Sequence, residues 1–115
     1  MINTPVIYDI DEYAELAEEF AVYPEHGTGS RGELAYLTLG LAGESGEVAE
    51  KVKKLIRDGK FDRDLTAKEL GDVFWYLVLL CKAIDVKPSL ILTQNIEKLA
   101  DRKRRNAISG EGDTR

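Results

Sequence analysis

The sequence predicts an all-α protein made of a single domain. Apolar residues recur every three or four positions along most of the chain, which is the spacing of one face of a helix. Breaks between these stretches are marked by Pro24, Gly59 and Pro88. No segment shows the alternation of apolar and polar residues expected of a strand. At 115 residues the chain is long enough for one domain with a modest core.

The first helix is expected over about residues 9–22. Residues 23–29 follow, and their proline and two glycines predict a loop. The first helix should be amphipathic, because its apolar residues fall on one face. These residues are Ile10, Tyr13, Leu16, Ala17 and Phe20.

The second helix is expected to run from Ser30 to about Asp58. Ser30 and Glu33 together form a capping-box signature for a helix start, and Gly59 is a stop signal. Residues 60–63 then form a short linker.

The third helix is expected to begin near Asp64 or Thr66 and to run to about Asp85. Residues 87–89, Lys-Pro-Ser, open the fourth helix, because proline is favoured in the first turn. The fourth helix should continue to about Asn106.

The predicted domain covers residues 1–108. The polar, glycine-containing residues 109–115 are expected to form a flexible tail.

Composition and charge exclude several classes of protein. A formal charge of −5 argues against non-specific binding of nucleic acid, and no apolar run is long enough to span a membrane. The N-terminus lacks the pattern of a secretion signal, and the single Cys81 excludes an intrachain disulfide. We therefore expect a cytoplasmic protein with neither a nucleic-acid nor a membrane partner.

Four acids stand where the core should be. The apolar stripe of the second helix has one gap, which Glu44 fills, and the stripe of the third helix extrapolates back to Glu69. Each has an acidic companion three residues later, Glu47 and Asp72, and residues three apart are neighbours on a helix. Four carboxylates gathered in a partly dry space must take up protons or bind cations. Such hard oxygen ligands suit Mg²⁺ or Mn²⁺.

Each acidic pair also has an alternative interpretation that involves no metal site. Glu69 could complete a capping box with Thr66, and Glu44, Glu47 and Glu50 could form a solvated helix face. Glycines inside the helices favour a ligand-binding site. Each glycine lowers the stability of the helix by about 1 kcal/mol relative to alanine, and its missing side chain leaves room for a ligand or for close packing of another helix. These glycines are Gly40, Gly43, Gly46 and Gly71.

The sequence lacks the residues that other kinds of metal or phosphate site require. His26 is the only histidine, so a di-iron site with two Glu-x-x-His motifs and a histidine-rich zinc site are both excluded. The chain has no phosphate-binding loop of the Gly-x-x-x-x-Gly-Lys-Ser/Thr type.

The two acidic motifs resemble those of the MazG-like nucleotide pyrophosphohydrolases. The segments that carry the resemblance are Gly40–Lys51, which contains Glu-x-x-Glu, and Glu69–Leu77, which contains Glu-x-x-Asp. It extends to residues 95–102 and to the last six residues, and covers about residues 36–115. This family belongs to the all-α NTP pyrophosphatase superfamily, with the dimeric dUTPases and the dCTP pyrophosphatases.

The resemblance implies a four-helix MazG-like bundle that is oligomeric, as a homodimer or homotetramer with active sites at subunit contacts. It implies that Glu44, Glu47, Glu69 and Asp72 are catalytic and hold Mg²⁺, for which Mn²⁺ can substitute. One of the four, with Glu47 a candidate, would orient or deprotonate the attacking water. The substrate-binding residues that it implies or makes candidates are Lys54, Tyr76, Asn95, Lys98 and Arg102.

The expected activity is hydrolysis of a nucleoside triphosphate, (d)NTP, to (d)NMP and pyrophosphate in nucleotide-pool control, with a slight preference for the purines dGTP or GTP. Trp75 and His26 are candidates to contact the base or cover the site, although an exposed loop residue is the favoured interpretation of His26. Two alternatives stay open. One is a metal-dependent phosphatase that releases orthophosphate, and the other is a non-catalytic helical interaction module.

Overall fold

The computed structural model describes residues 6–106, and over this range the protein contains four helices and no strand. They are α1 (Ile10–Glu18), α2 (Arg31–Asp58), α3 (Arg63–Ala83) and α4 (Pro88–Arg104). The all-α prediction with four helices is therefore confirmed. The predicted tail at 109–115 lies outside the described residues.

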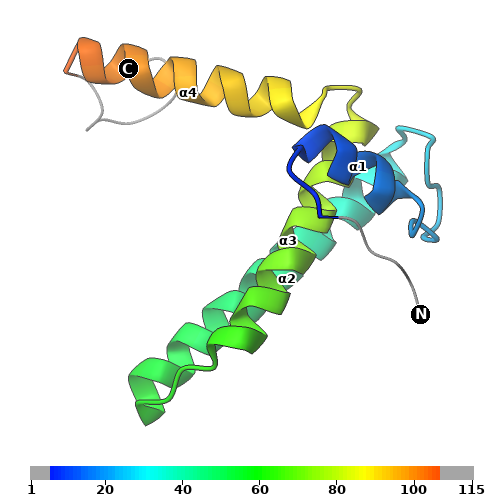
Figure 1. The fold of residues 1–115 in the computed structure, drawn as a ribbon. Helices are drawn as coiled ribbons and strands as arrows, with labels where there is room; N and C mark the ends of the chain where they lie inside the picture. The colour runs from blue at the N-terminus through cyan, green and yellow to red at the C-terminus, as the bar shows by residue number, and fades with distance from the viewer. Residues whose placement is uncertain (1–5, 107–115) are drawn as a thin grey trace.

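Helices α2 and α3 form a long antiparallel hairpin, and α1 packs across one end of it (Figure 1). Helix α4 packs against α1 and runs away from the hairpin (Figure 1). The Cα radius of gyration is 17.0 Å, whereas a compact domain of a hundred residues has about 13 Å. None of the four helices is long and apolar enough to cross a membrane in the described part of the chain.

The helix boundaries follow local signals. The Ser30 side chain accepts a hydrogen bond from the Glu33 N–H (3.2 Å) and caps α2 as predicted. Gly59, with φ of 71°, ends α2 in the left-handed conformation that favours glycine. Helix α3 begins slightly earlier than expected, because Asp62 accepts from the Leu65 N–H (2.9 Å) and acts as its cap. Both α3 and α4 end two residues before the expected positions.

Helix α1 is shorter than predicted. It ends at Glu18 rather than near Val22, and the chain continues in tighter turns. The indole N–H of Trp75 donates to the Ala17 carbonyl at this helix end (3.1 Å), which also accepts from the Phe20 N–H (3.1 Å). As a result Phe20, expected on the buried face, is 70% exposed.

The core lies where α1 crosses the hairpin. One cluster joins Ala14 and Ala17 of α1 to Val78, and a second joins Tyr23, Leu37 and Leu79, with Trp75 packed against both. The far end of the hairpin has only two layers. There Val52 and Leu55, expected in the core stripe of α2, are 42% and 40% exposed in this single chain.

Candidate metal centre

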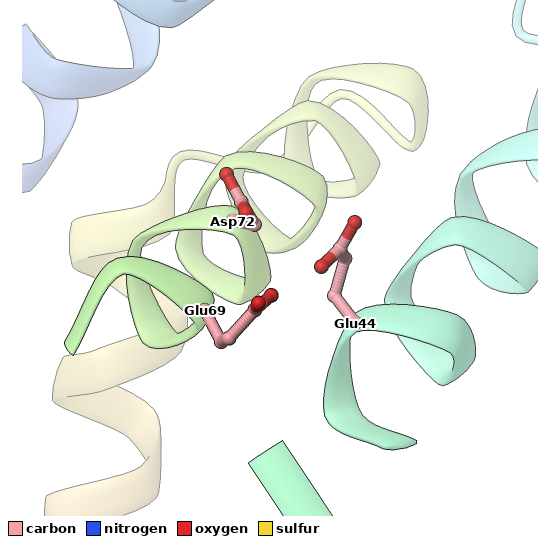
Figure 2. Close-up of side chains that lie close together, drawn as sticks. All are labelled: Glu44, Glu69 and Asp72. Carbon is pink, nitrogen blue, oxygen red and sulfur yellow. The ribbon is translucent and has the colours of Figure 1, made fainter. Parts of the chain in front are cut away.

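Three of the four predicted acids meet between α2 and α3. Glu44 extends from α2, and Glu69 and Asp72 extend from the facing side of α3, with their carboxylates pointing toward one another (Figure 2). One oxygen from each lies within 4.8 Å of those from the other two. Three hard oxygen donors this close form a group that could hold a divalent cation.

The helical register produces this meeting. Glu44 follows the fully buried Leu37 by seven residues, or about two turns, so both side chains face α3. The capping-box alternative for Glu69 is excluded: the Thr66 hydroxyl donates to the Asp62 carbonyl (2.7 Å), so Thr66 lies inside α3 rather than at its cap. Glu69 is thus free of a capping role.

The cluster is electrostatically unfavourable as it stands. Burial raises the pKa of the Glu44 carboxyl, and Asp72, Glu69 and Glu47 raise it further. Every neighbour that contributes to this shift is itself an acid. A cation among these groups would relieve the repulsion, so the residues present fit a divalent metal.

Glu47, the fourth predicted ligand, stands apart. Its side chain is exposed and does not belong to the group of three, although its negative charge helps to raise the pKa of Glu44. Glu50 instead pairs with Lys53 (3.0 Å), as expected of a solvated helix face. The alternative interpretation as part of a solvated helix face therefore holds for Glu50 but not for Glu44.

Tyr76 lies beside the acids, as the substrate-binding prediction requires. Its ring packs over Gly40 so closely that a Cβ at that position would overlap it. The pKa of Tyr76 is raised by burial first, and then by Tyr36, Glu44 and Asp72. The hydroxyl is therefore protonated at neutral pH and can donate a hydrogen bond next to the acids.

The other predicted substrate contacts are not gathered here within one chain. Lys54 is exposed on α2, ten residues beyond Glu44. Its charge helps to lower the pKa of Glu50 and of Asp58. Asn95, Lys98 and Arg102 belong to α4, which runs away from the hairpin (Figure 1). Asn95 is exposed, Lys98 is half-buried and Arg102 is 3% exposed.

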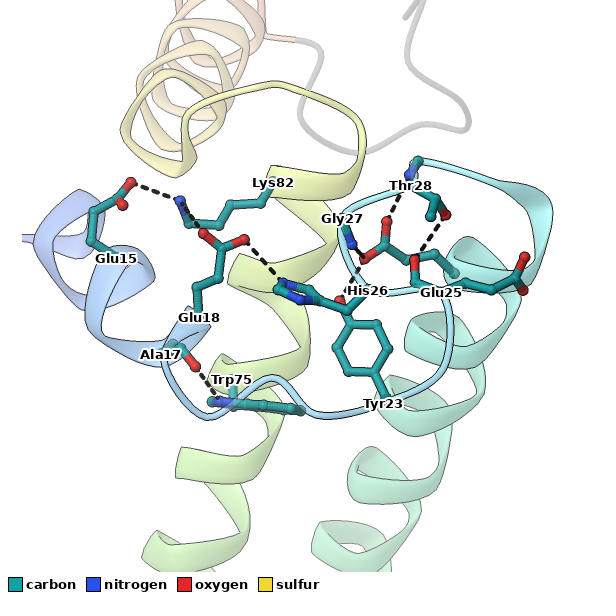
Figure 3. Close-up of polar contacts among 12 residues, drawn as sticks. Glu15, Ala17, Glu18, Tyr23, Glu25, His26, Gly27, Thr28, Trp75 and Lys82 are labelled. Carbon is teal, nitrogen blue, oxygen red and sulfur yellow. Dashed lines mark hydrogen bonds and ion pairs between the residues drawn. The ribbon is translucent and has the colours of Figure 1, made fainter.

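A second inward-facing glutamate on α2 was not recognised as special from the sequence. The carboxylate of Glu33, 2% exposed, accepts from the Tyr23 hydroxyl (2.7 Å) and from the N–H groups of Gly27 (2.8 Å) and Gly29 (2.9 Å). Figure 3 shows the loop of residues 23–29 held by such contacts. Burial raises the pKa of Glu33, but these hydrogen bonds outweigh it and the net pKa is lowered. The signal in the sequence was the glycine pair six and four residues before Glu33.

The two candidates for base contact have structural partners. Trp75 packs in the core and holds the end of α1, as described above. His26 is exposed, contacts Glu18 (3.2 Å) and packs edge-on against Tyr23 (Figure 3). Both help to fix the loop against α1 and α3.

A cavity of about 620 Å³ lies between α1 and the corner that joins α3 to α4. Four of its charged side chains have partners: Lys82 pairs with Glu15 (2.7 Å) and Glu18 (3.5 Å), and Asp11 accepts from the backbone N–H and hydroxyl of Ser89. Its lining does not include the three clustered acids. The contacts of Lys82 and Asp11 join α1 to α3 and α4.

The fold and the site together define an all-helical protein with an acidic cluster between two facing helices, suited to a divalent cation. A family model for the MazG nucleotide pyrophosphohydrolase domain matches residues 33–106, and the chain belongs to this family. It is 43% identical over 112 residues to the Gene 37 protein of Mycobacterium phage L5, covering 92% of this chain and 98% of that protein. No solved structure matches the chain significantly.

Proposed function

We propose that this protein hydrolyses nucleoside triphosphates to monophosphate and pyrophosphate in a Mg²⁺-dependent reaction that serves nucleotide-pool control. The observation that carries the proposal is the meeting of Glu44, Glu69 and Asp72, with oxygens within 4.8 Å, inside a domain of the MazG family. Mn²⁺ should replace Mg²⁺, and purine triphosphates such as dGTP and GTP are the preferred substrates.

Each residue has a distinct part in this proposal. Glu44, Glu69 and Asp72 hold the cation between the helices. When bound, Mg²⁺ neutralises charge on the phosphoryl oxygens and lowers the pKa of water. Glu47, which is exposed beside the cluster, accepts the proton of the attacking water in this proposal. The protonated Tyr76 hydroxyl donates to an oxygen of the phosphates or sugar.

The test of the reaction is a panel of all NTPs and dNTPs with Mg²⁺ or Mn²⁺, with the products separated by chromatography. We expect pyrophosphate and the monophosphate in equal amounts, and no turnover in EDTA. Orthophosphate as the first product would instead establish the phosphatase alternative. Failure of every nucleotide and metal, with an unchanged melting temperature, would leave the non-catalytic module.

We also propose that the complete site forms in a homodimer or homotetramer. Exposed apolar side chains along the hairpin and on α4 support this, and so does the large radius of gyration. Because α4 runs away from its own hairpin, Lys98 would reach the acids of a second copy rather than those of its own chain. The exposed apolar residues of the hairpin and of α4 include Val52, Ile56, Leu70, Phe74, Leu90, Leu92 and Ile96.

Mixing two inactive variants tests this arrangement. In a dimer that shares its sites, Glu44→Gln and Lys98→Ala chains combine so that one site of each mixed dimer is intact. Equal mixing with subunit exchange should restore roughly a quarter of the sites. If Lys98 serves its own chain, the mixture stays as inactive as its components.

A further inference from the structure

Tyr36 is a half-exposed aromatic residue on α2 for which the proposed reaction has so far no use. Its ring stacks on Tyr23, with centroids 4.9 Å apart and planes 14° apart, while 42% of its surface stays exposed. Tyr23 is itself buried and fixed by its hydrogen bond to Glu33. Tyr36 is therefore a rigidly backed aromatic surface that remains open to solvent.

Tyr36 shares one stripe of α2 with Glu47, whose charge acts on the Glu44 carboxyl of the acidic site. Gly40, Gly43 and Glu47 follow it at steps of four, three and four residues, which keeps all four on the same side of the helix. A Cβ added at Gly43 would have nothing within 4 Å, so the helix surface is open at Gly43, whereas the Tyr76 ring covers it at Gly40. Tyr76, packed over Gly40, borders this open stretch.

The separation between Tyr36 and the acids along the axis of α2 fits a nucleotide. Glu44 lies eight residues after Tyr36, or about 12 Å along the helix axis. This separation is comparable with that between the base and the phosphate chain of a nucleoside triphosphate. A nucleotide with its phosphates at the acids can therefore lie along α2 with its sugar over Gly43.

Resting on the proposed function, we propose that Tyr36 is the platform on which the substrate's base stacks, and so a specificity-determining residue. Stacking on an aromatic ring accepts any base, since every base has a π-face. The protein should then distinguish nucleotides from inorganic polyphosphate strongly and one base from another only weakly. Purines, with the larger ring system, should be favoured.

The test compares two ligands in the Tyr36→Leu variant of the full chain. Without the aromatic ring, KM for purine triphosphates should rise about tenfold or more, while kcat and the inhibition constant of inorganic tripolyphosphate stay within about twofold. Phe20→Leu, an equally aromatic-to-aliphatic change at a residue 70% exposed, is the matched control and should change neither value. Tyr36→Trp should keep or lower KM, because it enlarges the platform.

Each contrary result has its own meaning. A parallel rise in KM and in the tripolyphosphate inhibition constant would show that Tyr36 supports the fold or the phosphate site, and would overturn the inference. An unchanged KM in Tyr36→Leu would do the same, by showing that the base lies elsewhere. If the unmodified protein releases no pyrophosphate from any nucleotide, the proposed function fails and the inference falls with it.

Discussion

Helix α2 carries two glutamates that face inward, Glu33 and Glu44, and their surroundings differ completely. They are eleven residues apart, about three turns, and so lie on the same side of the helix. Glu33 is almost fully buried, yet its net pKa is lowered, because three donors of the chain itself surround the carboxylate. Glu44 is only half-buried, yet its pKa is raised, because it faces other acids.

The comparison separates a carboxylate with a structural role from the one to which we assign a functional role. Glu33 has all the partners it needs, and it holds the loop that leads into α2. Glu44 has partners that repel it, an arrangement that lowers the stability of the folded chain and that a bound cation would relieve. Burial alone therefore does not identify the site, whereas the sign of the neighbouring charges does.

The largest expected effect is on turnover. Glu44→Gln or Asp72→Asn should lower kcat by about 10³-fold or more, because a ligand of the cation is lost and the cation supplies several kcal/mol of transition-state stabilisation. Pyrophosphate release measures this, and circular dichroism should show an unchanged helix content. Glu50→Gln is the matched control, because Glu50 lies on the same helix but pairs with Lys53.

The same variants should differ from the unmodified protein in their response to metal. Mg²⁺ should raise the melting temperature of the unmodified chain and of Glu50→Gln, since a ligand that binds only the folded state stabilises it. Glu44→Gln should respond little. Near-normal turnover in Glu44→Gln, or an equal rise in melting temperature with Mg²⁺, would show that the cluster is not the metal site.

The second effect is on stability. Glu33→Ala leaves the Tyr23 hydroxyl and two backbone N–H groups without their acceptor, and should lower the free energy of unfolding by about 3 kcal/mol. Urea unfolding measures the change. Glu97→Ala, at an exposed position of α4, should stay within about 0.5 kcal/mol. If Glu33→Ala were equally harmless, the carboxylate would not be what holds the loop.

The sequence predicted the elements well where local chemistry decides them. The cap at Ser30, the stop at Gly59 and the interrupted stripes at Glu44 and Glu69 all follow from residues close in sequence. The early end of α1 did not, because the Trp75 indole that meets the Ala17 carbonyl is 58 residues away.

The capping-box prediction at Glu33 was half right for the same reason. The Glu33 backbone N–H does donate to Ser30, but its carboxylate turns to Tyr23 and the glycines instead of to the cap residue. Only the folded loop brings those donors together. The course of α4 could not be predicted either, because periodicity gives the face of a helix but not its direction relative to the hairpin.

The smallest effects should appear in how stability depends on pH, and they test the comparison most directly. The pKa of Glu44 in the folded chain lies above its ordinary value of 4.5. As the pH falls, the folded chain therefore binds a proton at Glu44 before the unfolded chain does. Without divalent metal, Glu44→Gln should therefore be more stable than the unmodified protein at neutral pH. This advantage should shrink as the pH falls through the raised pKa, and vanish below about 4.5.

Glu33 should show the opposite dependence, because its folded pKa lies below the ordinary 4.5. Its stabilising contribution is fully present above that value and is lost as the pH falls through the folded pKa. The deficit of Glu33→Gln should thus stay constant from pH 7 to about 4.5 and narrow only below it. Urea unfolding of both variants in EDTA across this range gives the two curves. If both differences changed over the same pH window, the two glutamates would not have the opposite surroundings on which the assignment of the metal site depends.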